Sequence, residues 1–506
     1  MTEKEQETDL SEGWINKVIL RIFGHDFHYE CENLCRVYYP NEKINIVYGD
    51  ENSDEREVIT VCEPVDGGNR LVVTAKTDGA EKSLEAVVTA EENELRDKSE
   101  LKTAQMIFAL LSELTGYTPP WGVLTGVRPS KLMLRLIADM GEEKAKEYFT
   151  GSLLVSDEKT NLAYTVAKAE EKIVDLSDKK SFSLYVSIPF CPTRCSYCSF
   201  VSHSIANSNA RKMVPEYLDK LSEEIRLTGD IASELGLRLE SVYFGGGTPG
   251  VLEAPQMDRL LTDIENSFDL STVREYTVEV GRPDTVTPEK LRALKLHDVG
   301  RISINPQTFN QKTLELIGRN HSVDQSVKAY TLAKAYGFKC INMDLIAGLP
   351  EETLEDFTAS VDTAVSLSPE NITVHTLALK RSSTLNASGA GVADGNTAKQ
   401  MLEYASKTLS GRNYQPYYMY RQSKCVGNLE NVGWCKPEHE CLYNVFMMEE
   451  CHTVLAVGAG AVTKLREPDG TNIERIFNYK YPYEYISDFE KITERKNGIK
   501  SFYLSY

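Results

Sequence analysis

Six short apolar stretches alternate with amphipathic stretches of helical period between residues 181 and 384, and this alternation constrains the fold more than any other feature. The expected strands are 184–188, 241–244, 276–280, 301–305, 340–346 and 372–379, and the expected helices between them are 216–235, 254–267, 288–296, 323–336 and 354–367. Strands that alternate with helices form a parallel sheet with right-handed crossovers. The pattern predicts the α/β class and a partial (β/α)6 barrel, whose reactive groups gather at the carboxyl ends of the strands.

The rest of the 506-residue chain predicts two further domains. Residues 1–176 read as an α+β extension: β-branched runs at 44–47, 58–61 and 70–75 predict a small antiparallel sheet, and helical spacing follows from 94 to about 174. A polar stretch at 177–180 is the candidate linker to the barrel, 181–384. Residues 385–506 are expected to form a mostly helical region that covers the substrate, beginning with a helix near 399–409.

Composition excludes several classes of function. The 56 Lys and Arg against 75 Asp and Glu leave a formal charge of −19, which repels nucleic acid and anionic membrane surfaces. The amino terminus has no secretion signal, and the longest apolar run, 453–462, is shorter than the ~20 residues that span a bilayer. We therefore expect a cytoplasmic protein without a membrane span or a nucleic-acid partner, whose 11 cysteines stay reduced.

Three of these cysteines lie on the loop after the first barrel strand. Cys191, Cys195 and Cys198 have C-x3-C-x2-C spacing. Iron–sulfur clusters are usually held by four thiolates, so three on one loop leave one iron open to a small ligand. A zinc site completed from elsewhere and incidental buried thiols are the competing interpretations, and the position of the group after a barrel strand favours the cluster.

Glycines and polar residues follow the next strands. A run of three glycines, 245–247, ends the second strand, where backbone without side chains can approach a ligand closely, although such a run is usually a turn. Further polar residues lie near the carboxyl ends of later strands: Glu279, Gln307, Arg319 and Asp344. For any one of these residues taken alone, a polar group at the barrel rim is as good an interpretation as a ligand-binding residue.

The C-x3-C-x2-C motif, with Tyr197 before the last cysteine, resembles the signature of the radical S-adenosylmethionine superfamily. In that superfamily the amino and carboxylate groups of S-adenosylmethionine chelate the open iron of a [4Fe-4S] cluster. Cleavage of the sulfonium then yields a 5′-deoxyadenosyl radical, while the protein orients the cofactors and excludes water.

The order of several stretches over residues 181–464 further resembles oxygen-independent coproporphyrinogen III dehydrogenase and its relatives. The stretches are YVSIPFC, VYFGGGTP, YTVEVGRPD, RISINPQTFNQKTLELIGRNH, NMDLIAGLP and AVGAGAVT. The resemblance implies that the cluster-bound S-adenosylmethionine contacts Tyr185, Tyr197, Gly246, Glu279 and, at its adenine, Val462. It also implies that a second S-adenosylmethionine contacts Gly247, Thr248, Gln307, Arg319, Asp344 and Ala378. The segment 121–131 resembles the branch with an amino-terminal extension, to which we assign no function.

Two positions depart from the decarboxylase. Ser187 replaces a histidine two residues after the strand tyrosine, and Phe200 replaces a cysteine two residues after the third ligand. Phe200 resembles the haem-chaperone relatives.

Three other groups have weaker patterns. Cys435, Cys441 and Cys451 are too widely spaced for a clear second cluster, so packed or surface thiols are the better interpretation, and Cys31 and Cys35 are expected to be structural. His375 is expected to be a satisfied core histidine, with a barrel-lining role as the alternative.

The expected substrate is a porphyrinogen or a haem-like molecule. Lys380, Arg381 and Arg421 are candidates to bind its propionates, and a solvated basic patch is an equally good interpretation of the aromatic and basic segment 417–424. The first hypothesis is oxidative decarboxylation of coproporphyrinogen III to protoporphyrinogen IX, with an electron donor such as flavodoxin or ferredoxin. The alternatives are other radical chemistry on a tetrapyrrole, namely methyl transfer or haem ring opening, and a haem-binding chaperone.

Overall fold

The computed structural model describes residues 17–40, 42–48, 56–77, 79–200, 202–379, 385, 391–422 and 424–506. It contains two compact units. The first comprises residues 1–164 with 421–429, and the second comprises residues 165–420 with 430–506. The boundary falls within helix α5 (Asp157–Val174), and the barrel and carboxyl-terminal regions, expected as separate domains, lie in one unit because their strands share one sheet.

The first unit is built on a five-stranded sheet in the order β2-β1-β3-β4-β5. Its strands are β1 (Lys17–Phe23), β2 (Lys43–Val47), β3 (Arg56–Val65), β4 (Gly68–Thr77) and β5 (Ala80–Thr89). Strands β3 to β5 are antiparallel as expected, but β1 pairs in parallel with both β2 and β3. The expectation of a fully antiparallel sheet was therefore wrong, because helix α1 (His28–Tyr38) forms the crossover that a parallel pair needs.

Helices complete this unit. Buried residues of α1 and of α2 (Glu92–Thr115) form one apolar core with the inward face of the sheet, including Leu71, Val73, Ile107 and Leu111. The following elements are α3 (Pro129–Met140), α4 (Glu142–Glu147) and a π-helical turn, η1 (Tyr148–Ser152). The alternation of buried positions along β4 fits a sheet with one covered face.

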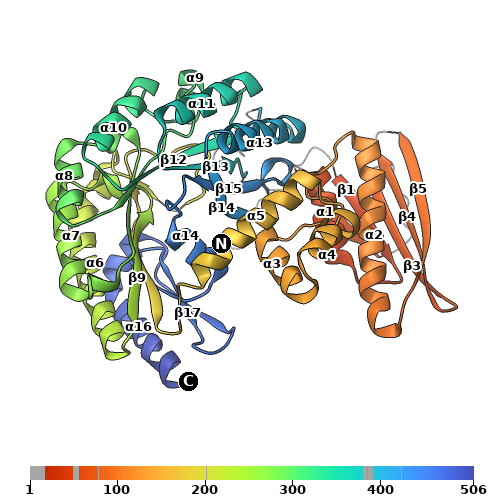
Figure 1. Ribbon diagram of the computed structural model, residues 1–506, viewed down its shortest axis with the longest axis horizontal. Coiled ribbons are helices and arrows are strands. Elements are labelled where there is room, and N and C mark those ends of the chain that lie inside the picture. Colours follow the sequence, from red (N-terminus) through yellow and green to blue (C-terminus); the bar gives the residue numbers. More distant parts are fainter. Residues whose placement is uncertain are drawn as a thin grey trace, which may run out of the picture. The chain divides into compact units, whose positions relative to one another are not determined.

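The second unit contains the expected partial (β/α)6 barrel. Six parallel strands lie side by side in chain order: β6 (Ser181–Ile188), β9 (Arg238–Gly246), β10 (Glu275–Gly281), β11 (Arg301–Ile304), β12 (Cys340–Ala347) and β13 (Asn371–Thr376). The connecting helices are α6 (Ser208–Glu234), α7 (Ala254–Ser267), α8 (Pro288–Leu296), α9 (Gln311–Leu316), α10 (Val323–Ala335) and α11 (Leu354–Leu367). Figure 1 shows these helices on the outer side of the curved sheet.

The carboxyl-terminal region is helical, as expected, and it also adds strands to both ends of the barrel sheet. Its helices are α13 (Gly395–Ser410), α14 (Leu442–Glu449), α15 (Pro482–Ser487) and α16 (Phe489–Leu504). Its strands are β14 (Gln415–Arg421), β15 (Glu430–Cys435), β16 (Thr453–Val457), β17 (Val462–Arg466) and β18 (Ile473–Phe477). Strand β15 is antiparallel to β13, and β16 is parallel to β6. Among the described residues, no helix has both the length and the apolar character needed to cross a membrane.

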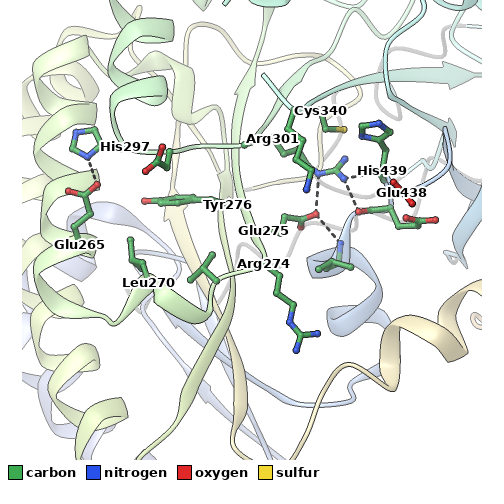
Figure 2. Close-up of a pocket in the computed structure, with 16 residues that line it drawn as sticks. Glu265, Leu270, Arg274, Glu275, Tyr276, His297, Arg301, Cys340, Glu438 and His439 are labelled. Carbon is green, nitrogen blue, oxygen red and sulfur yellow. Dashed lines mark hydrogen bonds and ion pairs between the residues drawn. The ribbon is translucent and has the colours of Figure 1, made fainter. Parts of the chain in front are cut away.

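A buried ion pair fixes α14 to the amino-terminal ends of the barrel strands (Figure 2). The Glu275 carboxylate accepts hydrogen bonds from the backbone N–H groups of Leu442 (3.0 Å) and Tyr443 (3.2 Å), the first residues of α14. Arg301 donates through Nε to Glu275 (3.1 Å) and through Nη2 to the carbonyl oxygens of residues 439 and 440. A carboxylate at a helix amino terminus satisfies unpaired N–H groups and complements the helix dipole.

Replacing Glu275 by Ala should lower the free energy of unfolding by about 3 kcal/mol or more, because it leaves a buried guanidinium without its anion. Urea and thermal unfolding measure the change. Glu223→Ala, which breaks the exposed Lys220–Glu223 pair, is the matched control and should change stability much less. Equal losses in the two variants would show that Glu275 does not anchor the helix.

Candidate functional site

The three motif cysteines lie together on the loop that follows β6. The loop begins with the short strand β7 (Phe190–Cys191), which pairs in parallel with β8 (His203–Ser204). Cys191 is buried and accepts a hydrogen bond from Thr248 Oγ1 (3.4 Å), while Cys195 and Cys198 are half-buried. Burial raises the pKa of Cys191 and, to about 11, that of Cys198, and the neighbouring motif thiols raise both further. The thiols of Cys191 and Cys198 therefore hold their protons until a metal displaces them.

The donor set fits an iron–sulfur cluster better than one metal ion. Within the described part of the chain, no group of three or more His, Cys, Asp or Glu side chains has the spacing of a single-ion site. A cluster differs from an ion in that each thiolate binds a different iron, so its ligands lie farther apart. Three sulfur ligands on one loop are the set that such a cluster requires.

The glycines at the end of β9 let the backbone pack closely against this loop. Gly246 has φ = +108°, and a Cβ at Gly247 would lie 2.5 Å from the Phe190 carbonyl oxygen and 3.0 Å from Cys191 Sγ. The Gly247 N–H donates to the Ile188 carbonyl oxygen (2.8 Å). The backbone here packs so closely against the cysteine loop that a side chain would displace it, which agrees with a close approach to a cofactor.

Two buried polar atoms at the same end of the barrel have no hydrogen-bond partner among the described residues. Gln307 has φ = +69°, and its side-chain Oε1 is buried with no hydrogen-bond partner among the described residues. Arg319 is 6% exposed and donates through Nη1 to the Asn305 carbonyl oxygen (2.6 Å), but its buried Nε has no partner within the same described set. Buried polar groups are normally paired, so these two atoms fit a polar ligand that the chain is built to receive.

Arg319 also lies against the cysteine loop. Burial alone would lower its pKa, but attraction to the Tyr197 phenol and the Cys195 thiol raises it above the ordinary value. Tyr197 is half-buried beside Arg319 and two of the motif cysteines, and burial raises its pKa. The structure thus brings Tyr197, Arg319 and the cysteine loop together.

The barrel interior is lined by stacked tyrosines. Tyr185 and Tyr243 are register partners on β6 and β9, with ring centroids 6.3 Å apart. Tyr443 of α14 stacks on Tyr243 at 4.4 Å and on Tyr185 at 6.0 Å. Sequence reasoning missed Tyr243, although strand alternation places it on the face of Tyr185, and no local signal marked Tyr443.

Glu279 lies on β10 next to this stack. Its carboxylate accepts a hydrogen bond from Tyr243 OH (2.5 Å). Burial raises the pKa of Glu279 to about 7, while the bond from Tyr243 opposes the shift and the charge of Asp344 adds to it. The carboxyl group is therefore poised to change its charge near neutral pH.

Asp344 and His375 form a polar pair on neighbouring strands. Asn342 Nδ2 donates to Asp344 Oδ1 (2.8 Å), and His375 Nε2 lies 3.7 Å from Asp344 Oδ2. Burial alone would raise the pKa of Asp344, but hydrogen bonding and attraction to His375 hold it below the usual value. The His375 side chain is 26% exposed, so the barrel-lining interpretation describes it better than a core histidine.

The other residues expected to bind cofactor or substrate lie as follows. Ala378 follows β13 at its carboxyl end, next to Leu377, whose N–H donates to the Ala347 carbonyl oxygen, and Val462 begins β17. Lys380 and Arg381 lie outside the described residues.

Arg421 belongs to the first unit. Its guanidinium donates to the carbonyl oxygens of Leu124 (2.5 Å), Gly126 (3.3 Å) and Asn428 (3.0 Å) and lies over the Trp121 ring. Arg421 therefore has a structural role and is no longer a candidate to bind the substrate.

The remaining cysteines lie in apolar surroundings. Cys435 and Cys441 lie in an apolar core cluster against which Cys451 packs, and Cys451 Sγ lies 3.7 Å from Ser177 Oγ. Burial raises the pKa of Cys31 and Cys35, the latter to about 12, as expected of packed thiols. Among the residues that the structure describes, these cysteines do not form a site for a single metal ion.

A cavity of about 390 Å³ opens at the opposite end of the barrel (Figure 2). It surrounds the amino-terminal end of β10 and is lined by residues that include Glu265, Tyr276, His297 and Lys339. Many of its charges are already paired, as in His297 with Glu265 (2.7 Å) and Arg301 with Glu275. In (β/α) barrels the reactive groups lie at the other end, so this cavity is not the candidate active site.

Comparison with known proteins agrees with this geometry. Residues 185–364 match the Radical SAM superfamily. The chain is 36% identical over 482 residues to the oxygen-independent coproporphyrinogen-III oxidase-like protein HemZ of Bacillus subtilis, covering 93% of this chain and 95% of the relative. It is 28% identical over 306 residues to the heme chaperone HemW of Escherichia coli, covering 60% of this chain and 75% of the relative.

A solved structure supports the fold. The coproporphyrinogen III oxidase HemN of Escherichia coli, described as a radical SAM enzyme, superposes with a TM-score of 0.51 at 22% identity over 65% of this chain and 73% of that one. The cysteine loop at the mouth of a partial barrel therefore defines a radical S-adenosylmethionine protein. Within that superfamily, the chain belongs to the family of oxygen-independent coproporphyrinogen-III oxidase-like proteins. Membership implies a [4Fe-4S] cluster and S-adenosylmethionine.

Anaerobically reconstituted protein should bind about four irons per chain, because three thiolates and one exchangeable ligand complete a [4Fe-4S] cluster. Replacing Cys191, Cys195 and Cys198 by Ala should abolish the iron content and the visible absorbance. The matched control replaces Cys435, Cys441 and Cys451 and should retain about four irons. A full cluster in the first variant would refute the assignment of its ligands.

The unfolding free energy of the cluster-free protein should fall as the pH rises through about 7, because the folded-state pKa of Glu279 lies above the ordinary 4.5. The contribution of Glu279 to the unfolding free energy is fully present below pH 4.5. For a pKa shift of this size it amounts to about 3 kcal/mol. In urea unfolding experiments at pH 5 and pH 8, Glu279→Gln should remove this part of the pH dependence of the unfolding free energy. Glu352, whose pKa burial also raises to about 7, remains in this variant and leaves a residual slope. An unchanged slope would show that Glu279 is charged throughout.

Proposed function

We propose that the protein is an enzyme of anaerobic haem biosynthesis that oxidatively decarboxylates coproporphyrinogen III. Each reacting propionate would lose one hydrogen atom from its β-carbon, then carbon dioxide and one electron, which would pass to an external one-electron acceptor, and would become a vinyl group. The hydrogen abstraction is the chemistry that the cluster and S-adenosylmethionine supply when bound. Two such reactions would give protoporphyrinogen IX, and a reduced flavodoxin or ferredoxin is the proposed electron donor.

The residues around the cysteine loop support a role in holding the cofactor. Tyr185, Tyr197, Gly246, Glu279 and Val462 are the proposed contacts of the cluster-bound S-adenosylmethionine. Gly246 offers bare backbone beside the loop, and Glu279 offers a buried carboxylate to a cationic ligand. The tyrosine stack behind them excludes water from the barrel interior.

The unpartnered atoms of Gln307 and Arg319 are the observation that carries the decarboxylase proposal. A guanidinium Nε and an amide oxygen, both buried, would pair with the carboxylate and the ammonium group of a second S-adenosylmethionine. Gly247, Thr248, Asp344 and Ala378 are its further proposed contacts. Two cofactors in one site would serve two successive decarboxylations.

The proposed substrate contacts are based on the negative charge of the substrate. A porphyrinogen with four propionates needs local cations in a protein with a formal charge of −19. Lys380 and Arg381 follow Ala378 closely in the chain and are proposed on the sequence alone. His375, whose side chain is partly exposed near the carboxyl end of β13, is a further candidate to bind the substrate.

A haem-binding chaperone is the second candidate function. Two relatives named as heme chaperones match 60% and 62% of this chain, and Phe200, which resembles the residue of the chaperone relatives, is 68% exposed beside the cysteine loop. Ser187, at the position of the decarboxylase histidine, donates to the Ala459 carbonyl oxygen (2.8 Å). Methyl transfer or ring opening of a tetrapyrrole is the alternative within radical chemistry.

An anaerobic assay separates these functions. The protein is supplied with coproporphyrinogen III, a strong reductant and excess S-adenosylmethionine, and 5′-deoxyadenosine and vinyl products are followed by mass spectrometry. Arg319→Lys should slow vinyl formation at least tenfold, or about 1.4 kcal/mol of barrier, because lysine cannot form a bidentate pair with a carboxylate. Iron content should not change.

Arg301→Lys is the matched control, since Arg301 is as buried as Arg319, at 6% exposure, but lies at the other end of the barrel. It should lower stability and leave the vinyl yield per folded protein unchanged. A wild-type protein that binds haem tightly, forms no vinyl product and cleaves no cofactor would exclude the decarboxylase and favour the chaperone.

A further inference from the structure

The turn between β16 and β17 is held by polar groups that are fully buried. This turn, residues 458–461, precedes Val462, the proposed contact of the cofactor adenine. Gly458 has φ = +95°, and a Cβ there would lie 2.6 Å from both the Ser187 carbonyl oxygen and Tyr217 OH. The turn therefore packs directly against β6, the strand that leads into the cysteine loop.

One carboxylate on α6 accepts three hydrogen bonds and forms one ion pair beneath the turn. Glu224 Oε2 accepts from the Gly458 N–H (2.7 Å) and Tyr485 OH (2.5 Å). Glu224 Oε1 accepts from Asn478 Nδ2 (2.7 Å) and lies 2.9 Å from Lys496 Nζ. The side chains of Glu224 and Lys496 have no solvent exposure.

A second set of bonds fixes the other side of the turn. The Ala459 N–H donates to Tyr217 OH (2.9 Å), which in turn donates to the Ser187 carbonyl oxygen (2.8 Å). Ser187 Oγ donates back to the Ala459 carbonyl oxygen (2.8 Å). The backbone at residues 458 and 459 is thus tied both to α6 and to β6.

Stability alone does not account for this arrangement. Removing two charges from water costs so much that a buried ion pair is often no more stabilising than apolar side chains of the same volume. What the pair does provide is one fixed position for the Gly458 N–H, because both carboxylate oxygens of Glu224 are held by further partners.

We propose that Glu224 is a positioning residue that holds the 458–461 turn against the adenine side of the S-adenosylmethionine site. The inference rests on the proposed function, since it takes Val462 as the adenine contact. Glu224 touches neither cofactor nor substrate and acts through the backbone of Gly458 and Ala459. No sequence motif marks it, and its partners come from the 458–461 turn, α15, α16 and the segment after β18.

The test compares S-adenosylmethionine affinity with stability in cluster-loaded protein. The variant Glu224→Gln with Lys496→Met removes both charges together, so no uncompensated ion is left in the core. Isothermal calorimetry should show at least tenfold weaker binding of S-adenosylmethionine with unchanged iron content. Tyr217→Phe, which removes only the hydroxyl between Ala459 and Ser187, should weaken binding in the same direction and serves if the double variant does not fold.

Glu240→Gln is the matched control. Glu240 has no solvent exposure either, and it accepts from Ser181 Oγ (2.7 Å) and Arg238 Nε (2.8 Å), toward the amino-terminal end of the barrel. Its loss should lower the melting temperature without changing affinity for S-adenosylmethionine. Affinity within twofold of the wild type in both Glu224→Gln/Lys496→Met and Tyr217→Phe would overturn the positioning role. A wild type that binds no S-adenosylmethionine at all would overturn the proposed function together with it.

Discussion

The parallel pairing of β16 with β6 is the constraint on which the site depends. Residues 453–457 pair with residues 182–186, so a strand from late in the chain forms the neighbour of the first barrel strand. This pairing brings the 458–461 turn against Ser187, at the end of the strand that leads into the cysteine loop. Six βα units alone would supply the cysteines and the glycine backbone but not this turn.

Two buried carboxylates attach the carboxyl-terminal region to the barrel at opposite ends. Glu275 binds the first N–H groups of α14 at the amino ends of the strands, and Glu224 binds the turn after β16 near the cysteine loop. Each is neutralised by one buried cation, Arg301 or Lys496. Because an unpaired buried charge is so costly, each pair specifies one docking geometry for its segment. The region expected to cover the substrate is therefore an integral part of the barrel core.

The sequence predicts those parts of the molecule that local patterns encode. Hydrophobic periodicity located β6, β9 to β13 and the connecting helices except the short α9, and the spacing of Cys191, Cys195 and Cys198 located the cysteine loop. The sequence did not predict the parallel pairing of β1, because nothing in the run Lys17–Phe23 indicates which strands pair with it. Tyr443, Glu224 and Lys496 were missed for the same physical reason: their roles arise from contacts across hundreds of residues, which no local pattern records. Arg421 was read from composition as an anion ligand, although backbone carbonyl groups use its donors.

The late position of β16 also determines when the site can exist during translation. The cysteine loop leaves the ribosome with β6 still lacking its neighbour, and the chain must grow from residue 188 to residue 453 before that neighbour is made. At elongation rates of roughly 5–20 residues per second, this interval is on the order of tens of seconds. Throughout it, one edge of β6 stays unpaired and the three thiols stay exposed, with the hazards of edge pairing and oxidation. A cluster inserted before β16 is made would therefore sit beside an open edge of the sheet.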